Sequence, residues 1–431
     1  MKRYVSNILS AWKTHSDRKP LIVRGARQVG KTWSVMDFGR TEFQNVVSID
    51  FERDRSAGAI FAGDLSPKAL IRLIELQARC PITPGTTLLF LDEIQCCPRA
   101  LTALRYFQEE MPELHVVAAG SLLEFEMSKI SFPVGRIEFH YMFPLTFGEF
   151  LCNTGRESLE QERPSIEEDR TVHGFVHGKL MDALREYMVV GGLPEAVKQY
   201  AQSQSLQSVS QVHDSILSSY LQDVLKYERN LSADSVELIL SSIIGQVGSQ
   251  IKYSRLAEGL SAYKVRQALH VLEKALVLHP IHSSSAQGLP LAGSVNSKVL
   301  KAVFMDVGLM QHSRGVSATA VLQTGDLMDI YQGALCEQFV GQELIAAGGS
   351  QHGRLFYWTR NAPTSNAEVD YLQVRAGRIV PIEVKNGPSG RLRSLHLFLQ
   401  EHPETSEGIV LHAGIGGRHE RIHFCPLYAK F

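Results

Sequence analysis

Residues 21–32 read LIVRGARQVGKT, an apolar run that leads directly into a glycine-containing loop. The segment from Gly25 to Thr32 fits the pattern G-x-x-x-x-G-K-[ST], in which a loop joins a buried strand to the start of a helix. Gly25 and Gly30 allow the backbone to turn so that its N–H groups point at phosphate oxygens. Lys31 brings a positive charge to the outer phosphates, and the hydroxyl of Thr32 is a ligand for magnesium. The stretch therefore predicts a site for a nucleotide phosphate.

The whole loop is expected to contact the nucleotide, because the positive end of the following helix dipole faces the same phosphates. The alternative is a glycine-containing turn that matches the pattern by chance, and the apolar strand before the loop argues against it. The expected nucleotide-binding residues are Gly25, Ala26, Arg27, Gln28, Val29, Gly30, Lys31, Thr32 and Trp33.

The composition is that of an ordinary soluble protein with room for two to four domains in 431 residues. The formal net charge of −1 predicts no overall attraction to nucleic acid, so any basic surface must be local. The six cysteines form no C-x-x-C pair and the histidines lack the H-E-x-x-H spacing, which indicates neither a zinc site nor a disulfide framework. Because no apolar run approaches about 18 residues, no membrane association is expected, and a reducing cytoplasm is the expected location.

Residues 87–93 read TLLFLDE, an apolar run that ends in two adjacent acids. A continuous apolar run predicts a strand buried on both faces of a parallel sheet, and ligands bind beyond the carboxyl ends of such strands. We expect Asp92 to support magnesium together with Thr32, and Glu93 to polarise the water that attacks the γ-phosphate. The alternative is that both acids cap the next helix.

Two further candidates follow along the chain. Residues 115–121, HVVAAGS, predict another buried strand, after which Ser121 either contacts the γ-phosphate or the water, or caps the following helix. Arg136 precedes a strand expected at residues 137–139; it either stabilises transition-state charge as an arginine finger or lies on the surface. A role for Arg136 in a neighbouring subunit would require a homo-oligomer, which the sequence leaves open.

The segments RGARQVGKT, FLDE, AAGS, GRIEF and FPLTFGEFL together resemble the AAA-type ATPases of bacteria and archaea that carry an uncharacterised C-terminal domain. Residues 191–197, GGLPEAV, are similar to that family's GG(Y/L)PEAV element, and the resemblance extends in pieces to Lys385. It implies ATP and magnesium (Mg) as cofactors. It also implies a sheet whose central strand carries the phosphate loop, with Asp92 on a neighbouring strand, and a helical lid over the adenine.

The remaining segments predict further helices, some of which form a pattern typical of DNA-binding modules. Residues 4–12 have helical spacing, residues 152–171 read as a polar linker, and residues 177–227 are expected to be helical. Helices at 235–247, from Tyr253 and at 264–274, followed by strands at 275–281 and 299–304, make a winged-helix pattern. This module either binds DNA or packs between domains. Its candidate recognition residues are Lys264, Arg266, Gln267 and His270.

A second group of charged residues lies near the C-terminus. If Ala376 and Gly377 form a two-residue turn, Asp370 lies opposite Glu383 and Glu368 opposite Lys385. Residues two apart share a face of a strand, so all four side chains point the same way. Two carboxylates and a lysine on one face can hold magnesium and activate a water.

This hairpin resembles the core of PD-(D/E)xK nucleases, and Glu337, on a helix expected at 331–345, matches their helix-borne acid. The candidate second site is therefore Glu337, Asp370, Glu383 and Lys385. The alternative is that opposite charges only stabilise the hairpin. Pro381 favours an edge or irregular position for its strand.

Taken together, we predict an α/β protein with an AAA-type P-loop parallel sheet, a helical lid, a winged-helix-like middle and a nuclease-like α/β C-terminal domain. The expected boundaries are 1–150, 151–230, 231–315 and 316–431. The expected function is ATP hydrolysis with magnesium that drives a conformational switch in a DNA-associated protein. The alternatives are an ATP-regulated metal-dependent DNA endonuclease and a nucleotide-bound interaction scaffold with little turnover.

Overall fold

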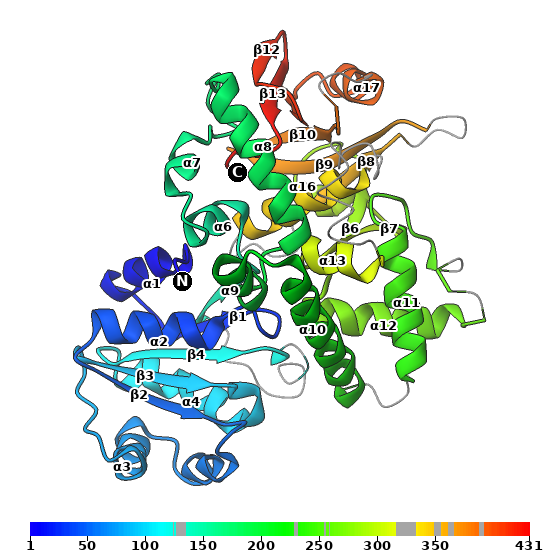
Figure 1. Cartoon of the computed structure of the whole chain (residues 1–431). Helices are drawn as coiled ribbons and strands as arrows, with labels where there is room; N and C mark the ends of the chain where they lie inside the picture. The colour runs from blue at the N-terminus through cyan, green and yellow to red at the C-terminus, as the bar shows by residue number, and fades with distance from the viewer. Residues whose placement is uncertain are drawn as a thin grey trace. The chain divides into compact units, whose positions relative to one another are not determined.

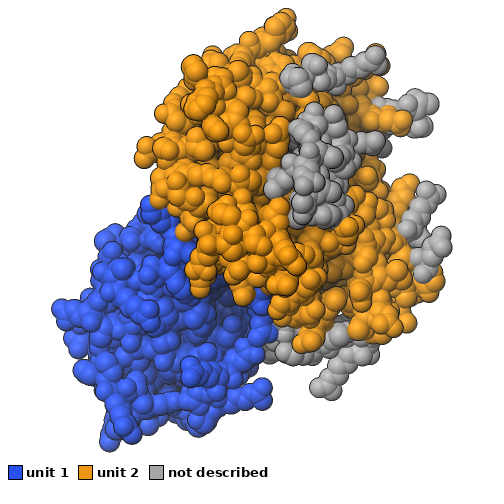
Figure 2. Space-filling view, viewed as in Figure 1, with its two compact units in different colours: residues 1–143, 274–276 blue, residues 144–273, 277–431 orange. Residues whose placement is uncertain are grey.

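The structure is a computed structural model, and its described residues fall into two compact units, coloured separately in Figure 2. Unit 1 comprises residues 1–143 and 274–276, and unit 2 comprises residues 144–273 and 277–431. Each unit contains a β-sheet of its own. The structure describes residues 1–123, 125, 135–227, 232–253, 256–257, 259–315, 333–348, 355–360, 366–387 and 392–431.

The sheet of unit 1 has five parallel strands in the order β2-β3-β4-β1-β5. The apolar strands β1, β3 and β4 are buried along their whole length, as a parallel sheet covered on both faces requires. The predicted α/β fold with a parallel sheet is confirmed. The strands are β1 (Leu21–Arg24), β2 (Asn45–Asp50), β3 (Thr87–Asp92), β4 (His115–Gly120) and β5 (Glu138–Tyr141).

The strand order corrects one expectation. The resemblance implied that the phosphate-loop strand is central and that Asp92 lies on the strand beside it. Instead, β1 lies between β4 and β5, one strand from the edge, and β4 separates it from the strand of Asp92. Because β4 ends in Ala118, Ala119 and Gly120, its small residues leave space at the carboxyl edge of the sheet. Side chains from α2 and β3 can therefore meet across the end of β4.

Helices cover both faces of this sheet. Helix α2 runs along one face and α1 packs beside it (Figure 1), which confirms the helix expected at residues 4–12. On the other face, Ile22, Leu89 and Val116 pack with Leu70 of α3 and Leu104 of α4 in one buried cluster. The helices are α1 (Val5–Thr14), α2 (Lys31–Glu42), α3 (Pro67–Ala78) and α4 (Pro98–Glu110), with the 3-10 helices η1 (Arg55–Phe61) and η2 (Ile94–Cys96).

Unit 2 begins with helices, and the helical prediction for residues 177–227 is confirmed by α8, α9 and α10. The predicted helices at 235–247 and 264–274 are confirmed as α11 and α12, whereas the helix expected from Tyr253 lies partly outside the described residues. The bounds are α6 (Phe147–Asn153), α7 (Glu157–Glu162), α8 (Gly174–Val190), α9 (Pro194–Ser203), α10 (Leu206–Tyr227), α11 (Ala233–Gly245), α12 (Ala262–Lys274), α13 (Val307–Ser313), α16 (Ala334–Ala347) and α17 (Arg393–Glu401).

The linker predicted at residues 152–171 is wrong in part, because α7 lies within it. Acidic residues in the first turn of α7 interact favourably with the helix dipole and stabilise the helix. The polar composition of the segment had favoured a linker over a helix. The buried Arg163 after α7 donates hydrogen bonds to the carbonyl oxygens of Tyr428 (2.6 Å) and Ala429 (3.1 Å). This segment is therefore anchored to the C-terminal residues of the same unit.

The GGLPEAV element makes a close contact with the start of α13. Asp306 accepts hydrogen bonds from the N–H groups of Gly192 (2.6 Å) and Leu309 (2.8 Å). A Cβ on Gly191 would lie 2.1 Å from the Asp306 carboxylate, and one on Gly192 would lie 2.0 Å from the carbonyl oxygen of Leu145. Burial raises the pKa of Asp306 to about 6. Both glycines are thus required by the close approach of neighbouring atoms.

The sheet of unit 2 has eight strands in the order β12-β13-β11-β10-β9-β8-β6-β7. The hairpin β6–β7, expected as the wing of a separate module, continues this sheet because β6 also pairs with β8. Described helices α16 and α17 pack against it. The strands are β6 (Leu278–Ser284), β7 (Val295–Phe304), β8 (Phe356–Thr359), β9 (Glu368–Arg375), β10 (Arg378–Val384), β11 (Gly408–His412), β12 (Gly417–His419) and β13 (Ile422–Pro426).

Pro381 favoured an edge or irregular position, and the edge alternative is wrong because β10 lies between β9 and β11. The pairing of β10 with β11 begins only at Ile382. Proline is tolerated one residue earlier because that position needs no N–H donor toward β11.

Among the residues that the structure describes, no helix is both long enough and apolar enough to cross a membrane.

Candidate functional site

The phosphate loop connects β1 to α2 at the carboxyl edge of the first sheet. Helix α2 begins at Lys31, and Gly30 before it has a φ of 92°. Gln28 also lies in the left-handed region, with a φ of 63°. Glycine adopts this conformation freely, whereas glutamine does so at a cost. The backbone is therefore turned sharply just before the helix N-terminus, as a phosphate loop requires.

The loop is braced by residues that precede α1 and follow β5. A Cβ on Gly25 would lie 2.2 Å from the carbonyl oxygen of Met142, so only glycine fits there without a shift. The buried Arg3 donates from Nη1 to the carbonyl oxygen of Val29 (2.9 Å) and from Nη2 to that of Phe143 (2.7 Å). Sequence reasoning did not find Arg3, because no motif joins it to a loop more than 20 residues away.

Lys31 is buried and folded back over the loop. Its Nζ donates to the carbonyl oxygens of Gly25 (3.0 Å) and Ala26 (2.8 Å). An ammonium in this position lies within the concave side of the loop, where the phosphates of a nucleotide are expected. Binding of a phosphate would therefore exchange these carbonyl contacts for stronger, charge-assisted ones.

Thr32 and Asp92 are in direct contact, although 60 residues separate them in the chain. The Oγ1 of Thr32 donates to Oδ2 of Asp92 at 2.7 Å. Burial, together with the carboxylates of Glu93 and Asp50, raises the pKa of Asp92 to about 6, and the Thr32 hydrogen bond opposes that rise. Asp50 is the register partner of Asp92 on β2. This set of hydroxyl and carboxylate oxygens fits magnesium, which prefers oxygen ligands.

Glu93 is held by two polar side chains, one of which the sequence did not indicate. Gln95 donates from Nε2 to Oε2 of Glu93 at 2.6 Å, and the hydroxyl of Ser121 donates to the same oxygen at 3.3 Å. Glu93 itself has a left-handed φ of 46°, and its N–H donates to Oδ1 of Asp92. The carboxylate of Glu93 thus has a fixed orientation beside Asp92. Ser121 joins the same cluster.

The other loop residues divide by exposure. Ala26 and Val29 are buried, and Arg27 forms an ion pair with Glu52 at 3.4 Å. Trp33, the third residue of α2, is 45% exposed. The loop therefore presents a charged and an aromatic side chain toward solvent next to the buried Lys31.

Arg136 is not brought to the phosphate loop. It precedes β5, and Glu138 at the start of that strand pairs with Leu21 at the start of β1. Because the strands are parallel, Arg136 lies at the amino edge of the sheet, whereas the loop follows the carboxyl end of β1. The Arg136 side chain is 55% exposed and forms an ion pair with Glu109 at 2.9 Å. Within this chain, the geometry leaves it no contact with the loop.

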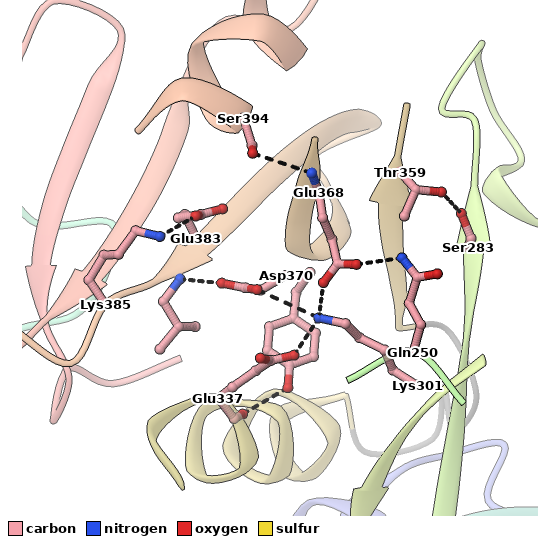
Figure 3. A network of polar contacts seen from close by, with 12 residues as sticks. Gln250, Ser283, Lys301, Glu337, Thr359, Glu368, Asp370, Glu383, Lys385 and Ser394 are labelled. Carbon is pink, nitrogen blue, oxygen red and sulfur yellow. Dashed lines mark hydrogen bonds and ion pairs between the residues drawn. The ribbon is translucent and has the colours of Figure 1, made fainter. Parts of the chain in front are cut away.

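The second group of charged residues lies on β9, on β10 with Lys385 directly after it, and on α16 (Figure 3). The predicted hairpin register is confirmed from Arg375↔Arg378 to Tyr371↔Ile382. Glu337 lies on a helix as expected. The expected positions of Asp370 opposite Glu383 and of Glu368 opposite Lys385 lie beyond this paired stretch and stay a prediction, while the Lys385 ammonium forms an ion pair with Glu383 at 2.5 Å. The ion-pair partners of these charged residues therefore could not be predicted from the hairpin alone.

The cation that Glu368 contacts is Lys301 of β7, which no sequence motif indicated (Figure 3). The Nζ of Lys301 also lies 2.7 Å from Oε1 of Glu337 and 3.6 Å from Oδ1 of Asp370. Lys301 is only 2% exposed, and lysine is rarely buried unless it is paired. A lone lysine in the apolar strand sequence VLKAVF was the available signal.

Burial and mutual repulsion raise the pKa values of two acids in this cluster. Burial and the nearby Asp370 carboxylate raise the pKa values of Glu337 and Glu383, while the ammonium groups of Lys301 and Lys385 lower those of Glu337 and Glu383 respectively. The ammonium of Lys301 occupies the space among Glu337, Glu368 and Asp370, where a divalent ion would need their oxygens. The expected magnesium does not fit this arrangement.

The candidate recognition residues lie on α12. Lys264, Arg266 and His270 are exposed, and Gln267 is half-buried. The Nε2 of Gln267 donates to the hydroxyl of Tyr263, which is 68% exposed. The structure therefore places these basic and aromatic side chains together on the solvent side of one helix.

Comparison with protein families assigns the parts of the chain separately. Residues 17–151 match the family model described as AAA domain. The N-terminal part of this chain is an AAA domain. Residues 181–320 match a Domain of unknown function (DUF8612), and residues 332–428 match a Domain of unknown function (DUF4143). The resemblance to AAA-type proteins with an uncharacterised C-terminal domain is thus confirmed, and the AAA domain contains the complete phosphate loop and Asp92.

Solved structures give weaker similarities, and the search of curated proteins found no match. The chain is similar to ORC1 of Aeropyrum pernix in complex with DNA, at 13% identity over 74% of this chain and 92% of that chain, with a TM-score of 0.30. It is similar to the Thermotoga maritima RuvB Holliday junction branch migration motor, at 16% identity over 64% of this chain and 86% of that chain, with a TM-score of 0.30. It is also similar to AMPPCP-bound DnaA from Aquifex aeolicus, at 12% identity over 62% of this chain and 86% of that chain, with a TM-score of 0.30. TM-scores this low support no functional argument.

Proposed function

We propose that the AAA domain binds ATP with magnesium and hydrolyses it, and that hydrolysis drives a conformational switch. The observation that carries this proposal is the 2.7 Å contact between Thr32 and Asp92, which joins the two halves of a nucleotide site. Lys31 and Glu93 lie directly beside these two residues in the chain. A phosphate-binding half and a metal-binding half in contact are what ATP hydrolysis requires.

In this proposal, Lys31 leaves the carbonyl oxygens of its own loop and binds the outer phosphates. Thr32 and Asp92 hold magnesium, which when bound neutralises charge on the phosphate oxygens. Glu93 orients the attacking water and accepts its proton, because it is the acid beside the proposed metal ligand. Gln95 and Ser121 fix the direction of the Glu93 carboxylate.

Nucleotide binding is tested by Lys31→Ala. We expect this variant to lose ATP binding in a calorimetric titration, because the charge that contacts the phosphates is removed. The control is Lys68→Ala, which removes an exposed lysine from α3 of the same unit. Full ATP affinity in Lys31→Ala would rule out the assignment of the loop.

Hydrolysis is tested by Glu93→Gln. We expect ATP binding to persist while turnover falls by roughly a hundredfold or more, which is the typical contribution of a positioned base. Equal, near-background turnover in both proteins would instead favour the nucleotide-bound scaffold.

A second proposal concerns DNA, and the exposed face of α12 supports it. Lys264, Arg266 and His270 can meet phosphates, and Tyr263 offers an aromatic surface beside them. Removing one cation that binds a DNA phosphate should reduce the slope of log affinity against log salt by about 0.9. We therefore expect Lys264→Ala/Arg266→Ala to weaken DNA binding in fluorescence anisotropy and to lower that slope.

The control for this measurement is Lys179→Ala/Lys198→Ala, which removes two exposed lysines from α8 and α9 of the same unit. Equal affinities and slopes for both double variants would contradict a DNA interface on α12. ATP turnover measured with and without DNA would then show whether the two proposed activities are coupled.

A further inference from the structure

The cluster of Figure 3 contains its own cation. We propose that Lys301 is the permanent counter-ion of Glu337, Glu368 and Asp370, and that its ammonium group excludes a divalent metal from this site. On this proposal, unit 2 keeps the strands and acids that resemble a nuclease but is closed to metal-dependent DNA cleavage. The inference concerns unit 2 and does not depend on ATP hydrolysis in unit 1.

The contacts of Lys301 match the capacity of an ammonium group. Its Nζ carries three donors, and three carboxylates surround it: Glu368, Glu337 at 2.7 Å and Asp370 at 3.6 Å. Glu337 comes from α16, whereas the other two acids come from β9. The ammonium therefore ties the helix to the sheet through the same oxygens that a metal would use.

Most of the remaining carboxylate oxygens are also engaged. Oε2 of Glu368 accepts from Gln250 at 2.7 Å, and Oδ2 of Asp370 accepts from the N–H of Val384 at 2.8 Å. Oε1 of Glu383 accepts from Lys385. Among the residues that the structure describes, Oε2 of Glu383 is a buried oxygen without a hydrogen-bond partner. A divalent cation that approached these acids would also meet the positive charge of the Lys301 ammonium and be repelled by it.

Lys301 is also held in place by the elements around it. The N–H of Ile251 donates to the carbonyl oxygen of Leu300 at 2.7 Å, and Leu300 donates back to Ile251 at 3.3 Å. This bridge fixes the segment that contains Gln250 beside the cluster. On another side, the ring of Tyr357 lies 5.5 Å from Nζ of Lys301. The ammonium therefore leaves the acids only if this part of the unit rearranges.

The test measures binding of Mn²⁺ to nucleotide-free, full-length protein by electron paramagnetic resonance of the free ion. Lys301→Met keeps an unbranched side chain that is one atom shorter and removes its charge, which exposes three acids to the metal. We expect Lys301→Met to bind one Mn²⁺ at least tenfold more tightly than the wild type. Adding Asp370→Asn to Lys301→Met should abolish the gain.

The matched control is Lys385→Met, which removes the other lysine of the cluster, paired with Glu383. It leaves Lys301 among its three acids, so we expect no comparable gain of Mn²⁺ binding. An equal gain in both lysine variants would overturn the specific role of Lys301.

A second comparison, between the wild type and Asp370→Asn, tests the proposal without Lys301→Met. The proposal can therefore be tested even if Lys301→Met does not fold. We expect wild type and Asp370→Asn to bind Mn²⁺ equally, and neither to nick plasmid DNA with Mg²⁺ or Mn²⁺. Mn²⁺ binding or nicking by the wild type that disappears in Asp370→Asn would overturn the proposal.

Discussion

At the scale of single residues, the acid most sensitive to its surroundings in the proposed ATP site is Asp92. Burial raises its pKa to about 6, whereas an exposed aspartate has a pKa of about 3.9. A bound cation requires the ionised form, so one pH unit below that pKa only about a tenth of the protein is ready to bind. If Asp92 holds magnesium as proposed, a proton on its carboxylate competes with the metal in mildly acidic solution.

We predict that lowering the pH from 7 to 5 weakens binding of magnesium-ATP by roughly tenfold more in the wild type than in Asp92→Asn. Protonation of ATP at low pH weakens binding to both proteins equally, so this effect cancels when the two pH profiles are compared. Calorimetric titrations at pH 5, 6 and 7 provide the measurement. Parallel pH profiles for the two proteins would contradict a role of the Asp92 carboxylate in metal binding.

Gln95 is predicted to act through Glu93. Removing its 2.6 Å hydrogen bond to Oε2 of Glu93 frees the carboxylate to rotate, and a hydrogen bond to a charged group contributes about 1.5–3 kcal/mol. We expect Gln95→Ala to lower kcat by roughly tenfold or more while KM changes little. Steady-state kinetics check this, and recovery of kcat in Gln95→Asn would separate positioning from a loss of structure. A change in KM alone would contradict the prediction.

The motif residues were predictable because their chemistry is tied to fixed spacing in the chain. Lys31 and Thr32 follow Gly30 directly, and Asp92 ends an apolar strand. The partners of Gln95 and Lys301 were not predictable, because they are set by a turn and by the pairing of distant strands. A polar residue outside a motif shows its role only when its neighbours are known.

At the scale of elements, the contact between β1 and the end of β5 depends on Gly25. A Cβ there would meet the Met142 carbonyl oxygen at 2.2 Å, so backbone has to move. We predict that Gly25→Ala lowers the free energy of unfolding by about 1–3 kcal/mol, the usual cost of overpacking. It should also weaken ATP binding, since the phosphate loop begins at this residue.

Gly58→Ala is the control, because a Cβ on Gly58 of η1 meets nothing within 4 Å. Urea unfolding of both variants checks the prediction. Equal stabilities would mean that the loop absorbs the added methyl group without strain.

The elements themselves were largely predictable, whereas their order in the sheets was not. Apolar runs of three or four residues predicted β1, β3 and β4, since strands buried on both faces need no alternation. The position of β4 between β1 and β3 depends on packing across the sheet, and the spacing of apolar residues along the chain does not predict it. The same applies to the hairpin β6–β7, whose pairing with β8 joins two segments that the sequence treats as separate.

At the scale of the whole molecule, a nucleotide-driven switch requires unit 2 to respond to the state of unit 1. We predict that hydrogen exchange in unit 2 differs between Glu93→Gln saturated with ATP and the same variant saturated with ADP. Unit 1 should be protected in both states, because a ligand at 100 times its Kd stabilises the folded form by about 2.7 kcal/mol. Hydrogen-exchange mass spectrometry separates peptides of the two units.

Lys31→Ala serves as the control, since without bound nucleotide neither unit should change. Identical exchange of unit 2 with ATP and ADP would contradict the switch and favour a static scaffold. The boundaries predicted at residues 150, 230 and 315 stay a prediction.

The exposed indole of Trp33 gives the proposed ATP site a built-in optical signal. The chain has three tryptophans, and the other two, Trp12 and Trp358, are 6% and 2% exposed. Emission that is quenched by a soluble agent such as iodide will therefore come mainly from Trp33, the residue directly after Thr32. Occupation of the phosphate loop should shield this fluorophore, so nucleotide association can be followed in real time without attaching any dye.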